Sequence, residues 1–183
     1  MLWGVKSRAT ALLGSAMFLV FAPGTIAGLI PWLIVQWPAP ADARWAAVGL
    51  IFLIPGAILL LDCFRRFAVQ GLGTPAPIAP PERLVVTGAY RHVRNPMYVA
   101  VVSLILGQAA LFASLPLLIY GVVMWAGFHA FVLGYEEPTL RRQFPEDYVV
   151  YFDAVPRWVP RFTPWDGTWL TRWEREDPDS GGG

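Results

Sequence analysis

The sequence of 183 residues contains a single cysteine, Cys63, and only two histidines. One cysteine excludes an intrachain disulfide and any metal site built from several cysteines. The histidines, His92 and His129, stand at unrelated positions with no acidic ligand pattern beside them, so we predict no metal site. The sequence also lacks a serine nucleophile elbow, a phosphate-binding P-loop and the Rossmann glycine pattern. We interpret Cys63 as a buried thiol that packs like a small apolar residue.

Charged residues are scarce, at 15% of the chain, and the net charge is only +1. This balance argues against nucleic acid as the main partner, because nucleic-acid-binding proteins favour strongly basic surfaces. Hydrophobic residues instead make up 56% of the sequence, and nine tryptophans accompany six tyrosines. Such a composition is too apolar for an ordinary soluble domain and is typical of a protein anchored at water–lipid boundaries.

Four apolar segments predict transmembrane helices, at about residues 11–35, 45–61, 96–112 and 117–135. The first segment could be a cleaved signal peptide, but its apolar run exceeds the roughly 7–15 residues of such signals. We therefore predict a retained helix, kinked at Pro23 and Pro31, whose freed carbonyl groups neighbouring helices must satisfy. The short link "ASLP" predicts that the last two segments form an antiparallel helical hairpin.

The expected fold is an all-α membrane protein with about four transmembrane helices, a helical hairpin formed by the last two, and a cytoplasmic interfacial cap. The cap is the stretch after Tyr135, which is polar, aromatic and too broken by proline to span a bilayer. The tryptophans expected to anchor it in the interface are Trp158, Trp165, Trp169 and Trp173. We expect one membrane-embedded domain over residues 1–175 and a disordered tail over residues 176–183.

Basic residues set the expected orientation in the membrane. Of the 14 Lys and Arg residues, only Arg44 lies on the opposite side from the others in this four-span topology. The positive-inside rule therefore places the loop at 62–95 and both termini in the cytoplasm. Arginine outnumbers lysine thirteen to one, as in GC-rich genomes, so we expect the inner (plasma) membrane of a bacterium. The segments that this topology brings together at the cytoplasmic boundary are 71–77, 90–98 and 135–140.

The stretch "GAYRHVRNPMYVA", residues 88–100, places basic groups directly before a predicted helix. Asn95 is a preferred N-cap residue and Pro96 a preferred first helical residue, so the helix is predicted to begin here. A helix N-terminus carries free N–H groups and partial positive charge, which favour an anion. The basic residues that would strengthen such a site are Arg91, His92 and Arg94. Alternatively, the arginines only contact the phosphates of membrane lipids.

The stretch "GYEEPTL", residues 134–140, places Glu136 and Glu137 where a membrane helix ends. The helix dipole disfavours acidic groups there, and two adjacent carboxylates near a bilayer repel each other, so they need partners. The pair could be solvated, or it could pair across the hairpin with Arg91 or Arg94. A site that holds both positive groups and carboxylates suits a zwitterionic ligand, such as an amino acid moiety.

Two weaker signals lie elsewhere in the chain. The segment "GLGTPAP", residues 71–77, would let the backbone at Gly71 and Gly73 approach a ligand closely, although most such loops are only loops. His129 lies seven residues before Glu136, on nearly the same face of a regular helix. It is either a hydrogen-bonded core histidine or a catalytic group.

Two stretches, "GLGTPAP…PPERLVVTGAYRHVRNPMY" and "YEEPTLRRQFPEDYVVYFDAVPRWVP", resemble the integral membrane methyltransferases over about residues 65–162. That group includes isoprenylcysteine carboxyl methyltransferases and phosphatidylethanolamine N-methyltransferases. The resemblance implies an enzyme that binds S-adenosylmethionine at the cytoplasmic end of a helical bundle. It also implies a lipid-like or prenyl acceptor, carrying a carboxylate or an amine, that enters from the bilayer.

The resemblance also implies which residues form the site. The glutamates would contact the ribose or amino group of the cofactor, and two tyrosines of the C-terminal segment would help to close the pocket. The residues expected to bind the cofactor are Gly71, Gly73, Tyr90, His92, Arg94, Asn95, Pro96, Tyr98, Glu136, Glu137, Tyr148 and Tyr151. For catalysis, Arg91 or Arg94 could orient a carboxylate acceptor, whereas His129 or a glutamate could accept the proton of an amine.

The sequence leaves the acceptor open. Prenylcysteine enzymes commonly carry His where Asn95 stands, and "NPMY" and "YEEP" look closer to the phospholipid enzymes. The stretch "EDYVVYFDAVPRWVPR" looks closer to the carboxyl methyltransferases. Two other functions compete with methyl transfer: an NADPH-dependent membrane reductase of the sterol-reductase type, and a non-enzymatic membrane scaffold or small transporter. The expected partners are an amphiphilic substrate and membrane lipids, without nucleic acid or metal.

Overall fold

The computed structural model describes residues 17, 19, 21–70, 84 and 86–166, and these residues form helices and no strand. The expected all-α fold is therefore confirmed for this part of the chain. Gly71, Gly73, the tail at 176–183 and most of the first half of the predicted segment 11–35 lie outside the described residues, as do Trp169 and Trp173.

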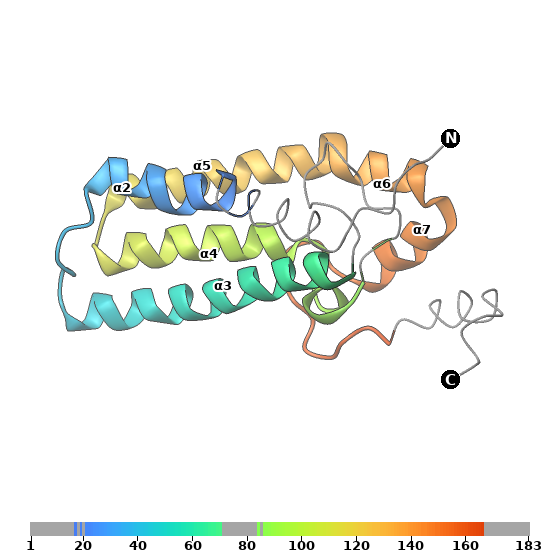
Figure 1. Ribbon diagram of the computed structural model, residues 1–183, viewed down its shortest axis with the longest axis horizontal. Coiled ribbons are helices and arrows are strands. Elements are labelled where there is room, and N and C mark those ends of the chain that lie inside the picture. Colours follow the sequence, from blue (N-terminus) through green and yellow to red (C-terminus); the bar gives the residue numbers. More distant parts are fainter. Residues whose placement is uncertain (1–16, 18, 20, 71–83, 85, 167–183) are drawn as a thin grey trace.

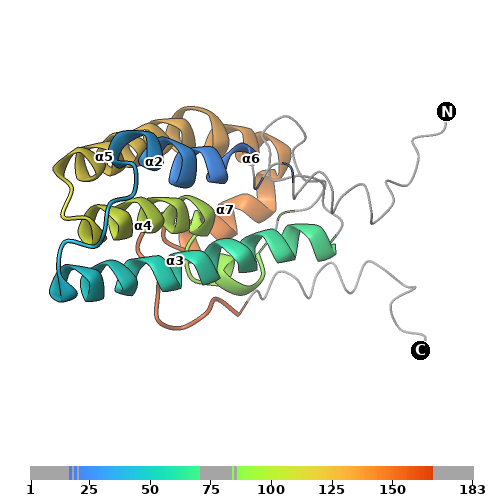
Figure 2. The same cartoon turned by 60° about the vertical axis from the view of Figure 1, so that its left-hand side comes forward.

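Three long helices run side by side, with α4 in the middle (Figure 1). Their bounds are Ala43–Gln70 for α3, Pro96–Leu111 for α4 and Leu115–Phe131 for α5. The first described segment, residues 21–35, contains a π-helical turn, η1 (Thr25–Leu29), followed by α2 (Ile30–Val35). This segment lies against α4 and α5, as the second view also shows (Figure 2).

Glycines allow α3 and α4 to approach each other closely. A Cβ built on Gly49 of α3 would lie 2.8 Å from the carbonyl oxygen of Gly107 in α4. A Cβ built on Gly107 would lie 2.7 Å from Cγ of Leu53. Helices in membranes associate largely through such close contacts between small residues, because the surrounding lipid is as apolar as the helices.

The first segment is irregular, as its prolines predict. Pro31 has no N–H group, so it cannot donate to Ala27 as in an α-helix, nor to Ile26 as in a π-helix. Both carbonyl oxygens find other donors: Gln108 Nε2 donates to Ala27 O at 2.7 Å, and the Tyr120 hydroxyl donates to Ile26 O at 2.9 Å. Neighbouring helices thus satisfy the freed carbonyl groups, which confirms the expectation from the sequence.

Two helical stretches are long and apolar enough to cross a membrane, by length and composition: Ala43–Arg66 and Leu115–Gln143. They contain the predicted spans 45–61 and 117–135. The other two apolar helices, Thr25–Val35 and Pro96–Leu111, are shorter. A 16-residue helix rises only about 24 Å, less than the roughly 30 Å of a bilayer core. The four-span topology therefore stays a prediction.

α3 is longer than expected at its C-terminal end, because it continues to Gln70 and not to Leu61. Asp62 forms ion pairs one turn further along the same helix, at 3.1 Å to Arg65 and 2.7 Å to Arg66. Such i, i+3 and i, i+4 pairs stabilise a helix beyond its apolar part. Cys63 is fully buried, as the sequence predicts.

The predicted hairpin of α4 and α5 is present, and the Ser114 side chain caps α5 by accepting from Leu117 N. A second π-helical turn, η3 (Val132–Glu136), joins α5 to α6 (Glu137–Gln143), and α7 (Pro145–Ala154) follows. Figure 1 places α6, α7 and the C-terminal end of α3 at the same end of the bundle.

A second, smaller hydrophobic core lies at this end of the bundle. We name it the terminal cluster, and its buried members are Val86, Tyr148, Tyr151, Val155 and Trp165. The expectation that Trp165 anchors in the membrane interface is wrong, because only 7% of this residue is exposed and its ring packs 5.7 Å from that of Tyr151. The tryptophan is part of a core that fixes the C-terminal segment.

Candidate functional site

The candidate site lies where α4 begins and where α5 passes into α6. α4 starts at Pro96 with Asn95 in the N-cap position, as predicted. The Asn95 side chain makes no capping hydrogen bond, however, and its Nδ2 donates to Arg157 O at 3.2 Å. The first turn of α4 is therefore not capped by Asn95, and its N–H groups and positive dipole end face the site.

Glu137 is held by two arginines. Arg94 Nη1 donates to its Oε1 at 2.8 Å, and Arg157 donates to both carboxylate oxygens, at 2.6 and 2.9 Å. The side chains of Glu137 and Arg94 are only 9% and 8% exposed. The hydrogen bonds that Arg157 donates to Glu137 raise the pKa of Arg157 above its ordinary value, so the arginine stays charged. The pairing of a glutamate with Arg94 across the hairpin, weighed from the sequence, is therefore present.

Arg157 was not predicted from the sequence. Its backbone lies beside the 88–100 stretch, since the amide of Arg94 donates to Pro156 O at 2.9 Å. The available signal was the charge balance: a buried carboxylate pair near a bilayer needs cations, and the C-terminal segment supplies arginines after the last helix. The sequence offers several such arginines and does not distinguish among them.

Glu136 has a different environment from Glu137. The Tyr98 hydroxyl donates to its Oε2 at 2.9 Å, and the Tyr98 ring packs on Phe128 with centroids 4.8 Å apart. Within the described ranges, no basic side chain forms an ion pair with Glu136. Arginines thus neutralise the carboxylate of Glu137, whereas Glu136 contacts a neutral donor in the described part of the chain, the Tyr98 hydroxyl.

The π-helical turn η3 begins three residues after His129 and ends at Glu136. A π turn contains more residues than an α turn, so the seven-residue spacing does not place these side chains on one face. His129 instead accepts a hydrogen bond at Nδ1 from Trp158 Nε1 at 3.0 Å, and it stacks on Trp125. Because Nδ1 is occupied as an acceptor, the neutral ring carries its proton on Nε2.

Arg91 and His92 bind the backbone of the C-terminal segment. Arg91 Nε donates to Trp165 O, and the Trp165 amide donates back to Arg91 O at 2.9 Å. His92 Nδ1 lies 2.8 Å from Arg161 O and must donate to that carbonyl, while the Arg161 amide donates to His92 O. Arg91 and His92 therefore hold the segment after α7 against the residues that precede α4.

The two tyrosines that were predicted to close the pocket lie in the terminal cluster. The Tyr151 hydroxyl donates to Tyr90 O at 2.8 Å, and Tyr148 and Tyr151 are almost fully buried in the terminal cluster. Burial raises the pKa of both phenols above the ordinary value, so they stay protonated donors. Nearby, the Phe152 ring lies 4.0 Å from Cζ of Arg94 and 4.3 Å from Cζ of Arg141.

The Nε–H group of Arg94 is buried and has no hydrogen-bond partner among the described residues. It lies next to the uncapped first turn of α4, one residue before Asn95. A buried donor without a partner is costly, and a bound acceptor would satisfy it. The site thus offers donors for an anion on one side and the Glu136 carboxylate for a cation on the other. Among the residues that the structure describes, no three His, Cys, Asp or Glu side chains lie close enough together to hold a metal ion.

The comparisons with known proteins give one match. The sequence model of a family described as phospholipid methyltransferase matches residues 45–147. The matched range begins in α3 and ends in α7, so it includes the start of α4, the π turn and both glutamates. No curated protein and no solved structure matches the chain significantly.

Proposed function

The chain belongs to the phospholipid methyltransferase family, a family of membrane enzymes that methylate lipids, and from this premise we propose its cofactor, acceptor and site. The methyl donor is S-adenosylmethionine, and the acceptor is the amine of a phospholipid headgroup that reaches the site from the bilayer. The observation that carries the proposal is the asymmetry of the two glutamates: among the described residues, two arginines neutralise Glu137, whereas no basic side chain pairs with Glu136.

The residues of the site fit the zwitterionic end of this cofactor. The uncapped first turn of α4 and the unpartnered Arg94 Nε–H group would hold its carboxylate. Glu136 would hold its ammonium group or its ribose hydroxyls, with Tyr98 fixing the position of the carboxylate. When bound, S-adenosylmethionine supplies an electrophilic methyl group on a positively charged sulfur. We propose that Gly71 and Gly73 lie near the cofactor, and this part of the proposal rests on the family resemblance alone.

The contribution of the protein to the reaction is chiefly alignment. The first turn of α4, Arg94 and Glu136 would hold the methyl donor, which would supply its methyl group to the neutral amine of the acceptor. The proton that the methylated nitrogen must release would pass to solvent. Correct alignment of bound reactants can contribute roughly 7–11 kcal/mol to such a reaction. We assign Arg94 to the cofactor, and Arg91, His92 and His129 to positioning the segment 155–166 that covers the site.

In the membrane, we propose that four spans carry the site at their cytoplasmic end, with both termini on the same side, in a bacterial inner membrane. Among the described basic residues, Arg44 is the exception, because it lies where α3 begins, away from α6 and α7. The positive-inside rule then orients the end with Arg94, Arg141 and Arg157 toward the cytoplasm.

The cofactor class is tested by titrating the purified wild-type protein in detergent with S-adenosylhomocysteine and, separately, with NADPH. We expect saturable micromolar binding of S-adenosylhomocysteine by calorimetry and no heat of binding for NADPH. Binding of NADPH alone would place the protein among membrane reductases. A folded protein that binds neither compound would overturn the assignment of the site.

A further inference from the structure

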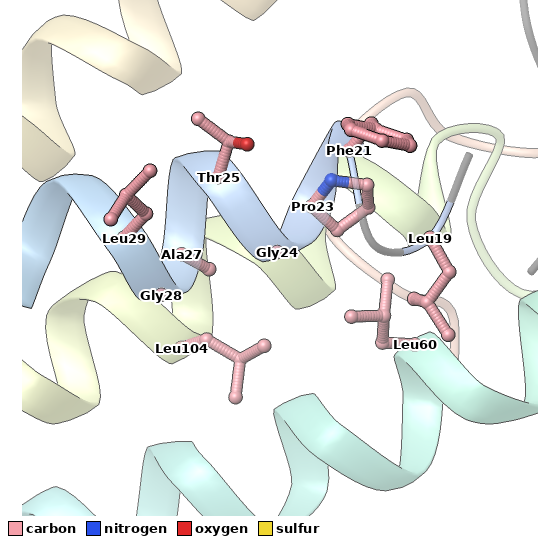
Figure 3. A pocket seen from close by; sticks show the side chains of 10 residues that line it. All are labelled: Leu19, Phe21, Pro23, Gly24, Thr25, Ala27, Gly28, Leu29, Leu60 and Leu104. Atoms are coloured by element: carbon pink, nitrogen blue, oxygen red, sulfur yellow. The ribbon is translucent and has the colours of Figure 1, made fainter. Parts of the chain in front are cut away.

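An open apolar groove of about 620 Å³ runs between the first segment, α3 and α4 (Figure 3). Among the described lining residues, Thr25 alone carries a polar side chain. These residues are Leu19, Phe21, Pro23, Gly24, Thr25, Ala27, Gly28, Leu29, Leu60 and Leu104. In Figure 3, the first segment forms one wall, α3 with Leu60 forms the other, and Leu104 of α4 lies between them.

The groove follows from the irregular backbone of the first segment. Tyr120 and Gln108 tie the π turn to α5 and α4 through its carbonyl oxygens, so the segment packs on those helices. Gly28 faces open space, because a Cβ built there would meet no other atom within 4 Å. Glycine at this position therefore leaves room that a larger side chain would fill.

The groove is continuous with the core that adjoins the candidate site. Leu60 belongs to a hydrophobic cluster with Phe64, and both Leu19 and Met97 pack against that cluster. Met97 lies in the first turn of α4, next to Tyr98, the residue that donates to Glu136. Leu104 is about 12 Å further along the helix axis than Pro96, so this wall of the groove lies on the bilayer side of the site.

We propose that this groove holds one hydrocarbon chain of the phospholipid acceptor and thereby sets the position of its headgroup at the start of α4. The inference rests on the proposed function, which requires an acceptor with its headgroup at the site and its chains in the bilayer. A hydrocarbon chain matches the apolar lining, and the groove shares α4 with the site, since Leu104 lines the groove and Tyr98 contacts Glu136. Since lipid and groove are similarly apolar, the groove acts through packing and alignment rather than through the hydrophobic effect.

The matched variants are Gly28→Phe, which fills the groove, and Gly127→Phe. Gly127 lies on α5 outside the groove, and a Cβ there also meets nothing within 4 Å. Methyl transfer is measured with dipalmitoyl and with dihexanoyl phosphatidylethanolamine in detergent micelles. For the dipalmitoyl lipid, we expect kcat/KM of Gly28→Phe to fall by about tenfold or more, because small misplacements of a reacting group are costly. For the dihexanoyl lipid, we expect kcat/KM of Gly28→Phe to change by less than about twofold, and the same holds for its affinity for S-adenosylhomocysteine. Gly127→Phe is expected to change kcat/KM on either lipid by less than about twofold.

A second readout requires no turnover. A phospholipid with a photoreactive diazirine in one acyl chain is crosslinked to the protein, and the adducts are mapped by mass spectrometry. We expect adducts at Leu60 and Leu104 that decrease in Gly28→Phe but persist in Gly127→Phe. Unchanged adducts, or equal kcat/KM for both variants on the long-chain lipid, would overturn the groove proposal. Loss of S-adenosylhomocysteine binding by the wild type would instead count against the proposed function.

Discussion

Replacement of Glu137 by leucine is expected to lower the free energy of unfolding by about 3–5 kcal/mol, the usual cost of breaking a buried ion pair on one side only. Arg94 is 8% exposed at its side chain and would keep its charge without a counterion. Arg157 is 26% exposed and can turn toward water, so most of the cost arises at Arg94. The measurement is reversible unfolding in detergent, followed by circular dichroism.

The double variant Glu137→Leu/Arg94→Met provides the control. Removing both buried charges replaces an ion pair with apolar groups of similar volume, which is often close to neutral. We therefore expect the double variant to be more stable than Glu137→Leu. Two results would show that the ion pair is not the central structural contact of the site. One is a free energy of unfolding of Glu137→Leu within about 1 kcal/mol of the wild type; the other is a loss of stability in the double variant equal to the sum of the losses in Glu137→Leu and Arg94→Met.

Replacement of Glu136 by glutamine is expected to weaken S-adenosylhomocysteine binding by about 10- to 100-fold, the value of one hydrogen bond to a charged group. The ion pairs of Glu137 remain, and Tyr98 can still donate to the amide oxygen, so the melting temperature should stay close to that of the wild type. Calorimetric titration and thermal unfolding of the same preparation separate these two effects.

The matched control for this variant is Asp153→Asn, which removes an exposed carboxylate from α7 at the same end of the bundle. It should leave both the affinity and the melting temperature unchanged. Equal losses of affinity in Asp153→Asn and Glu136→Gln would indicate a general electrostatic effect. Unchanged affinity in Glu136→Gln would remove this glutamate from the cofactor site.

Local signals in the sequence were sufficient to predict where α4 begins and that its first turn lies close to the two glutamates. The Asn95–Pro96 pair predicts the start of α4 because both residues have strong positional preferences at helix N-termini. The short apolar hairpin then brings the N-terminal end of α4 and the C-terminal end of α5 to the same side of the bundle. Arg94 is therefore placed near the glutamates. The close approach of residues 90–98 and 135–140 is confirmed by the contacts of Arg94 and Tyr98.

The division of roles between the two glutamates could not be predicted from the sequence. It depends on the π turn η3, which changes the register of the helix just before Glu136, and π turns have no reliable sequence signature. It also depends on Arg157, which reaches Glu137 from a segment of irregular backbone. The sequence treated the glutamates as a pair, whereas only Glu136 lacks a basic partner in the described part of the chain.

Tertiary contacts also explain the remaining differences. Polar Gln108 in an otherwise apolar helix was a signal for an interhelical hydrogen bond, and its partner at Ala27 required the packing of the first segment. The extension of α3 to Gln70 comes from charge pairs within the helix and from burial of Cys63 and Phe64 against the core. A prediction from hydrophobic residues alone ends this helix at its last apolar residues, near Leu61.

The most direct test of methyl transfer to a phospholipid amine uses wild-type protein in vesicles and S-adenosylmethionine with a labelled methyl group. Vesicles contain phosphatidylethanolamine in one sample and phosphatidylcholine, whose nitrogen is already fully methylated, in the other. We predict that label appears in the lipid fraction of the first sample only, and that Glu136→Gln reduces it strongly while Asp153→Asn does not. Equal labelling of both lipids, or no labelling by protein that binds S-adenosylhomocysteine, would contradict transfer to a phospholipid amine.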